Sequence, residues 1–130
     1  AGVPQDWSTH MIGHELTALY NIDHARTLAI VLPAMLTVRQ DAKREKLLQY
    51  AQRVWHINEG NEQQRIELAI SKTRDFFERL GVDTRLSAYN LDSTDVEKIL
   101  AQLQAHKMTA LGEKREITLE VSRQVLTLCL

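Results

Sequence analysis

The stretch HMIGHELTALYNIDHARTLAIVLP, residues 10–33, decides the fold of this chain of 130 residues. It carries three of the five histidines of the chain, His10, His14 and His24, and it ends in a run of apolar residues. His10 and His14 are four residues apart, so on a helix both imidazoles project from one face about one turn apart. The rest of the chain shows the spacing of packed helices. We therefore expect a helical protein whose chemistry lies in this stretch.

A polar break, Asn21-Ile22-Asp23, predicts a turn between two helices within the stretch. Such a turn could bring His24 back beside the first two histidines. Imidazole is the commonest protein ligand for zinc and also suits iron, so the spacing permits a metal site. A histidine pair four residues apart also occurs on helices with no metal, and the spacing does not say which histidines bind. Glu15 follows the second histidine, so the pattern is not the H-E-x-x-H motif of metalloproteases.

Composition indicates one compact domain over residues 1–130, since 44% of the residues are apolar. The net charge of -1 gives no support for binding nucleic acid or an anionic membrane. The longest run without charge, Thr27 to Val38, has twelve residues and is too short to span a bilayer. The single cysteine, Cys129, excludes an internal disulfide and is consistent with a cytoplasmic location.

The apolar periodicity and the capping residues predict an all-α bundle of six helices. We expect Asp23 and Asp41 to cap the second and third helices, Asn61 with Gln64 to form a capping box at the fourth, and Thr118 to cap the sixth. The expected ranges are about 6–20, 23–38, 42–56, 61–80, 93–106 and 118–128, with residues 108–116 as a loop.

The second expected helix has almost no polar face between residues 28 and 36. In a chain of this length, we expect part of its cover to come from a missing domain or a partner subunit, and the chain to form a homo-oligomer. Phe76, Phe77, Leu80 and Leu128 are expected to pack inward on the fourth and sixth helices.

Taken together, the pattern H-x3-H-x9-H followed by Leu32-Pro33 resembles the iron-containing alcohol dehydrogenase family. The segments 6–16 (DWSTHMIGHEL) and 23–25 (DHA) are most similar to the branch of bacterial butanol dehydrogenases and NADPH-dependent aldehyde reductases. The wider family usually has Pro-His-Gly where this chain has Asp-His-Ala. The resemblance extends through Gln49-Tyr50-Ala51, Val54-Trp55, Phe76-Phe77-Glu78 and Ile117-Thr118-Leu119.

This resemblance implies roles for the three histidines. His10 and His24 would be ligands of a divalent metal, iron or zinc. His14 would lie beside the reacting carbon and the nicotinamide of NADP or NAD, as a catalytic, substrate-orienting or proton-relay residue that also contacts the cofactor. The reaction would transfer a hydride between the nicotinamide and an aldehyde or primary alcohol.

The resemblance also implies that the chain is the later part of a helical domain with a dehydroquinate-synthase-like fold. Family members carry a preceding α/β domain that binds the dinucleotide, and they complete the metal site with an Asp and a further His that have no counterpart before His10. The chain alone is therefore expected to be inactive. The alternative is a helical interaction module with no catalytic role, in which the histidines are structural.

Overall fold

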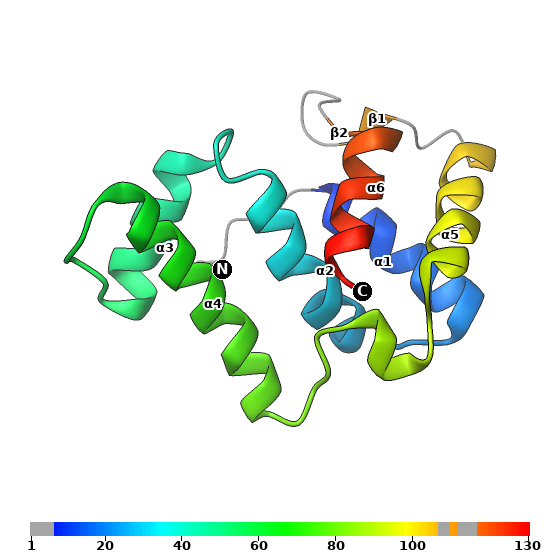
Figure 1. The fold of residues 1–130 in the computed structure, drawn as a ribbon, viewed down its shortest axis with the longest axis horizontal. Helices are drawn as coiled ribbons and strands as arrows, with labels where there is room; N and C mark the ends of the chain where they lie inside the picture. Colours follow the sequence, from blue (N-terminus) through cyan, green and yellow to red (C-terminus); the bar gives the residue numbers. More distant parts are fainter. Residues whose placement is uncertain (1–6, 107–109, 112–116) are drawn as a thin grey trace.

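The computed structural model describes residues 7–106, 110–111 and 117–130. Across these residues the chain forms six α-helices, a short 3-10 helix and one antiparallel pair of two-residue strands (Figure 1). The prediction of an all-α fold is confirmed, and the strand pair was not expected. The elements are α1 (Trp7–Tyr20), α2 (His24–Val38), α3 (Arg44–Trp55), α4 (Glu62–Arg79), η1 (Leu86–Tyr89), α5 (Ser93–Ala105), β1 (Ala110–Leu111), β2 (Ile117–Thr118) and α6 (Leu119–Leu128).

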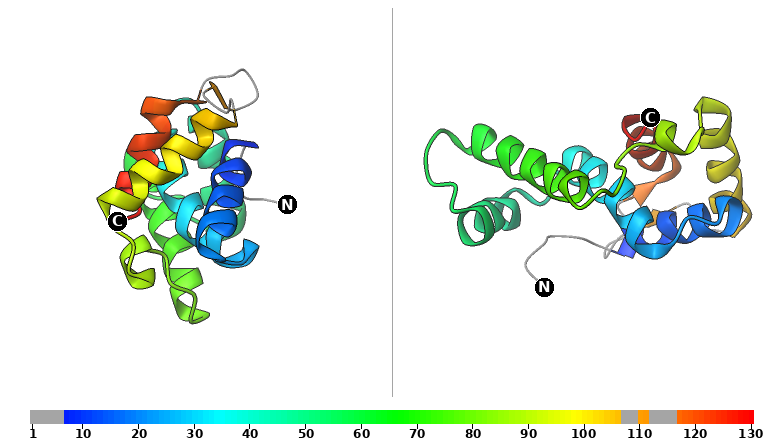
Figure 2. Two further views of the ribbon diagram at one scale, coloured as in Figure 1. Left: turned by 90° about the vertical axis from the view of Figure 1, so that its right-hand side faces the viewer. Right: turned by 90° about the horizontal axis from the view of Figure 1, so that it is seen from below.

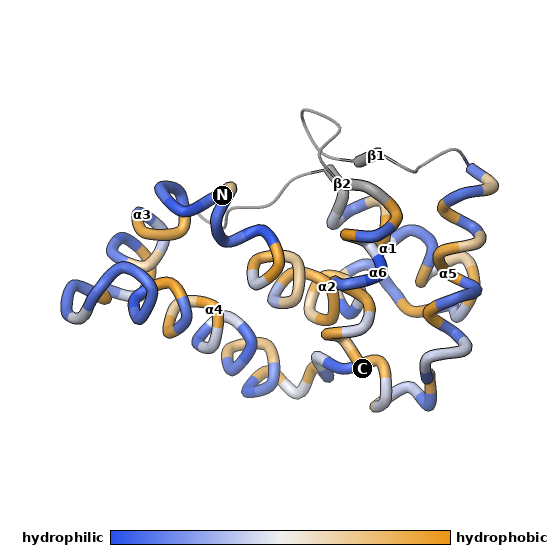
Figure 3. The backbone as a smooth tube through the Cα atoms, turned by 45° about the horizontal axis from the view of Figure 1, so that its top comes forward, coloured by the Kyte–Doolittle hydropathy of each residue, from blue (hydrophilic) through white to orange (hydrophobic). Residues whose placement is uncertain are grey.

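Helix α2 runs through the middle of the molecule, between two groups of helices. The α3–α4 hairpin extends on one side of α2, while α1, α5 and α6 gather on the other (Figures 1 and 2). Each side has its own cluster of buried apolar residues. The tube coloured by hydropathy shows the middle of α2 as largely hydrophobic (Figure 3). Both clusters therefore share one helix.

The spacing of the α2 side chains explains how one helix can serve two clusters. Residues four apart lie on one face of a helix, and Leu28, Leu32 and Leu36 pack toward α3 and α4. The cluster on the other side takes Ile30, Val31, Ala34 and Met35.

Every residue of α2 from Ala29 to Leu36 is buried by this chain alone. The expectation that a missing domain or a partner covers this helix is therefore wrong, because α1, α4 and α6 cover it. Among the described residues, no helix combines the length and apolar character that a membrane crossing requires.

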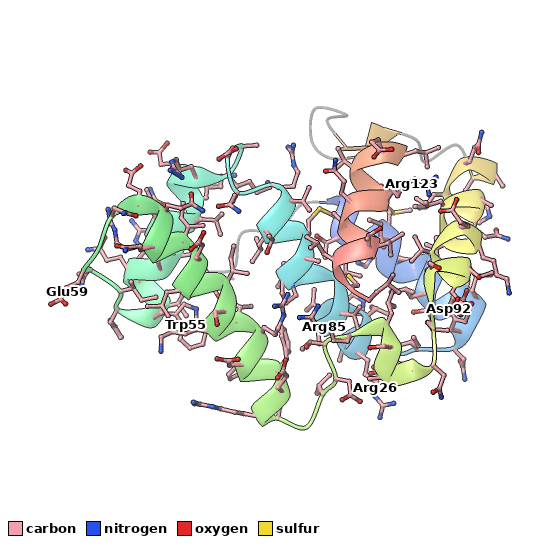
Figure 4. The ribbon with its side chains drawn as sticks, viewed as in Figure 1. Arg26, Trp55, Glu59, Arg85, Asp92 and Arg123 are labelled. Carbon is pink, nitrogen blue, oxygen red and sulfur yellow. The ribbon has the colours of Figure 1, made fainter. Side chains whose placement is uncertain are left out.

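Most of the predicted helix starts are confirmed. The Asp23 carboxylate accepts a hydrogen bond from the backbone N–H of Arg26 at 3.0 Å, and Asn61 forms a full capping box with Gln64. Asp92, labelled at the start of α5 in Figure 4, also forms a capping box. The prediction for Asp41 is wrong, since the third helix starts later and Lys43 occupies its N-cap position.

Two groups of residues differ from the inward packing expected of them. Phe76 and Leu80 are 49% and 63% exposed, because the last turns of α4 extend past the helices that cover its middle (Figure 1). Leu128, in the last turn of α6, is 42% exposed. The predicted loop at 108–116 falls mainly outside the described residues, and so does the side chain of Thr118.

Polar contacts join α1 to both ends of α5. Near the start of α5, the Tyr20 hydroxyl donates to Asp95 Oδ1 at 2.8 Å. Burial and this hydrogen bond raise the pKa of Tyr20 to about 12, so the hydroxyl keeps its proton. At the other end, His106 Nδ1 lies 2.7 Å from Oε1 of Glu15, whose side chain is only 5% exposed.

The second of these contacts gives a testable prediction about stability. Replacing His106 by Ala should lower the free energy of unfolding by about 1–3 kcal/mol, because it leaves a buried carboxylate without its hydrogen-bond partner. Urea unfolding followed by circular dichroism measures this. Gln104→Ala, at an exposed position of the same helix, is the matched control. Equal stability of the two variants would contradict the prediction.

Candidate metal centre

A tight turn between α1 and α2 brings the three histidines of the stretch together. Asn21 has a left-handed backbone, with φ of 55°, and its N–H donates to the carbonyl of Thr17 at 2.9 Å. The Thr17 hydroxyl donates across the turn to the carbonyl of Ile22 at 2.7 Å. These bonds reverse the chain within three residues, so the start of α2 lies beside α1.

His10 lies between the other two histidines. Its Nε2 is 3.0 Å from Nε2 of His14, a hydrogen bond in which one ring donates and the other accepts. The ring centroids of His10 and His24 are 5.3 Å apart, with the rings edge to face at 71°. His14 and His24 are exposed, and His10 is partly buried. The expectation that a turn brings His24 back beside the first pair is confirmed.

The separation of the His10 and His24 rings fits a shared metal ion. With a metal–nitrogen bond of about 2.1 Å and a ring centre about 1.1 Å beyond the nitrogen, two imidazoles on one tetrahedral metal have centroids about 5.2 Å apart. The observed value is 5.3 Å. Within the described residues, no group of three or more His, Cys, Asp or Glu side chains is arranged to hold a metal. The fit therefore concerns a pair of ligands and not a complete set.

Electrostatics favour the uncharged form of His10. Its pKa is lowered from the ordinary value of 6.5 by burial, and further by the neighbouring His14 and His24. A histidine must be neutral to bind a metal. At neutral pH the central ring of the cluster is thus in the protonation state that ligation requires.

The contact between Glu15 and His106 is the feature near this site that the sequence did not reveal. Glu15 follows His14 directly, yet it is buried and paired with a residue 91 positions away. Neither residue type nor spacing signals such a pair. On a helix over residues 6–20, Trp7 and Met11 share one side with His14, so the sequence predicts a partly apolar histidine face. Met11 is partly buried, and the Trp7 side chain falls outside the described residues.

Comparison with known proteins identifies the family. The model of the Fe-containing alcohol dehydrogenase family, C-terminal, matches residues 2–128. The chain belongs to this family. It is 59% identical over 125 residues to the NADPH-dependent aldehyde reductase YqhD of Escherichia coli, covering 96% of this chain and 32% of that protein. It is 30% identical over 121 residues to the NADH-dependent butanol dehydrogenase A of Clostridium acetobutylicum, covering 92% of this chain and 31% of that protein.

The fold is that of the E. coli relative. A solved structure described as the substrate and cofactor-free form of the aldehyde reductase YqhD from E. coli superposes with a TM-score of 0.94 at 57% identity. The match covers 100% of this chain and 34% of that chain. This chain thus spans about a third of the length of these relatives.

The lowered pKa of His10 can be tested by titration. In the metal-free chain, the His10 ring should titrate below 6.5. As the pH falls through the range between that lowered pKa and 6.5, the unfolded chain takes up a proton that the folded chain does not. Folding should therefore weaken across this range. NMR of the ring proton signals measures the titration.

A variant at the neighbouring ring supplies the control for this titration. His14→Gln removes one of the two neighbouring charges, so the pKa of His10 should rise toward its ordinary value while remaining lowered by burial. A pKa of His10 at or above 6.5 in the unaltered chain would contradict the prediction.

Proposed function

We propose that this chain is the metal-holding helical part of an NAD(P)-dependent alcohol dehydrogenase or aldehyde reductase. The observation that carries the proposal is the 5.3 Å separation of the His10 and His24 rings on two helices joined by a tight turn. In the proposal, residues 1–130 form a single helical domain. The nicotinamide cofactor is bound mainly by a separate dinucleotide-binding domain, which accords with the share of its relatives that the chain spans.

His10 and His24 are the proposed metal ligands. Zinc takes four ligands in a tetrahedral site, of which up to three are protein side chains in catalytic sites. The two histidines therefore need further ligands from outside the described residues. Imidazole suits both iron and zinc, and the family name favours iron. When bound, the metal would act as a Lewis acid that polarises a carbonyl or alkoxide oxygen.

His14 is the proposed catalytic residue. It is exposed and its Nε2 lies 3.0 Å from His10, so it borders the region where a substrate would approach the metal. In aldehyde reduction, the hydride of the reduced nicotinamide adds to the carbonyl carbon and a proton adds to the oxygen. His14 would orient the substrate against the nicotinamide, or deliver that proton.

The substrate class follows from the names of the relatives. The E. coli protein is an NADPH-dependent aldehyde reductase and the Clostridium protein an NADH-dependent butanol dehydrogenase. We propose a small aldehyde or primary alcohol as substrate, with NADP or NAD as cofactor. Self-association and a cytoplasmic location stay predictions from the sequence.

The observed geometry is less favourable to the alternative of an interaction module with structural histidines. That alternative would be favoured if His10 and His24 pointed apart, or if they were buried without polar company. Their ring centroids instead lie 5.3 Å apart, with the rings edge to face, and both His14 and His24 are exposed.

A chimeric enzyme tests the proposal. In it, this chain replaces the matching segment of the E. coli aldehyde reductase, to which it is 59% identical. His10→Ala and His24→Ala should each lose bound metal and lower kcat/KM by more than about 100-fold, beyond the cost of losing an outer partner of a ligand. His14→Asn should keep the metal and lower kcat by about 10²–10⁴-fold, the range of acid–base catalysis.

Metal content is measured by elemental analysis and activity by the absorbance of NADPH. His56→Ala, at an exposed site far from the cluster in sequence, is the control and should change neither. Full metal content in both His10→Ala and His24→Ala would overturn the ligand assignment. Turnover of an aldehyde and NADPH by the isolated chain would contradict the proposal that a separate domain binds the nicotinamide cofactor.

A further inference from the structure

Helices α1 and α2 lie close together at Gly13 and Thr27. A Cβ atom placed on Gly13 would lie 2.9 Å from Oγ1 and 3.4 Å from Cβ of Thr27. The first distance is shorter than a normal contact between carbon and oxygen, so any side chain at residue 13 would have to displace Thr27 or the helix that carries it. Both residues are buried.

Thr27 has little freedom to move aside. Its side chain is 1% exposed, and its Oγ1 donates to the carbonyl of His24 at 2.8 Å. Turning the hydroxyl away would break its bond to the first turn of α2, the turn that carries His24.

The contact lies one helical turn from each proposed ligand. His10 and Gly13 are three residues apart on α1, and His24 and Thr27 are three residues apart on α2, so each pair shares a face of its helix. A change in the distance between the helix backbones at Gly13 and Thr27 would therefore act within one turn of both imidazoles.

We infer that Gly13 and Thr27 are positioning residues, which hold His10 and His24 at the separation that a shared metal requires. This inference rests on the proposed function. The absence of a Cβ at residue 13 allows the close approach, and the Thr27 side chain packs into the space that this absence leaves. The two residues act as a pair, since the space that one leaves is filled by the other.

Two variants of the 130-residue chain test the pair. Gly13→Ala should push the helices apart, although Ala favours a helix more than Gly does. The nuclear Overhauser effect between the His10 and His24 ring protons should then weaken. Zinc affinity, followed by the same ring signals during titration with zinc chloride, should fall about tenfold, at the low end of the 10–100-fold cost of losing an outer-shell partner. Adding Thr27→Ala should restore both, because it removes the atoms that the new methyl group meets.

Three controls separate the possible failures. Ile99→Val, in the core of α5, should lower stability without changing the Overhauser effect or the affinity. His10→Ala and His24→Ala should abolish zinc binding. If these two bind zinc as the unaltered chain does, the proposed function fails, while the Overhauser effect still tests the positioning.

The inference itself is overturned in either of two cases. In the first, the histidine variants lose zinc but Gly13→Ala leaves both readouts unchanged, whether or not the variant is less stable. In the second, Gly13→Ala weakens both readouts and Thr27→Ala does not restore them.

Discussion

The burial of α2 on both sides is the constraint on which the rest of the structure depends. One apolar stripe of this helix meets the α3–α4 hairpin, and the other meets α1, α5 and α6. Since the free energy gained by burying apolar surface grows with the area removed from water, these helices are held around α2. Only the first turn of α2 departs from this pattern. There His24 is exposed, and α1 folds back to place His10 beside it. The helix that organises the core thus also fixes one side of the candidate metal centre.

The histidine cluster combines exposure with a rigid frame. The turn bonds of Thr17 and Asn21 set the start of α2, and the Tyr20–Asp95 and Glu15–His106 contacts set the rotation of α1 against α5. The rings themselves remain open to solvent at His14 and His24. A site that must admit a substrate and a cofactor needs such openness, while its ligands need fixed positions. In this site the helix backbones fix the positions of the ligands, and the exposed faces of the rings keep the site open.

Much of the fold could be predicted from the sequence, because helix caps and apolar periodicity depend only on residues close together in the chain. The Asn61–Gln64 capping box and the Asp23 cap gave two helix starts correctly, and the expected range 93–106 matches α5 closely. The full cover of α2 could not be predicted, since it depends on α4 and α6, which are distant from it in the sequence. The exposure of Phe76 and Leu80 could not be predicted either, since it depends on where α4 extends past its neighbours. The spacing of His10, His14 and His24 predicted their proximity but not their roles, which came only from the resemblance to a family. The Glu15–His106 pair and the Gly13–Thr27 contact join separate helices and leave no mark in local periodicity.

The measurement that tests the central claim most directly is anomalous diffraction from crystals of the metal-loaded protein, with this chain joined to a dinucleotide-binding domain. The account predicts one anomalous peak at about 2.0–2.2 Å from a nitrogen of His10 and a nitrogen of His24, with His14 beyond bonding distance. A peak bonded to His14 in place of either residue, or one that touches neither His10 nor His24, would contradict it.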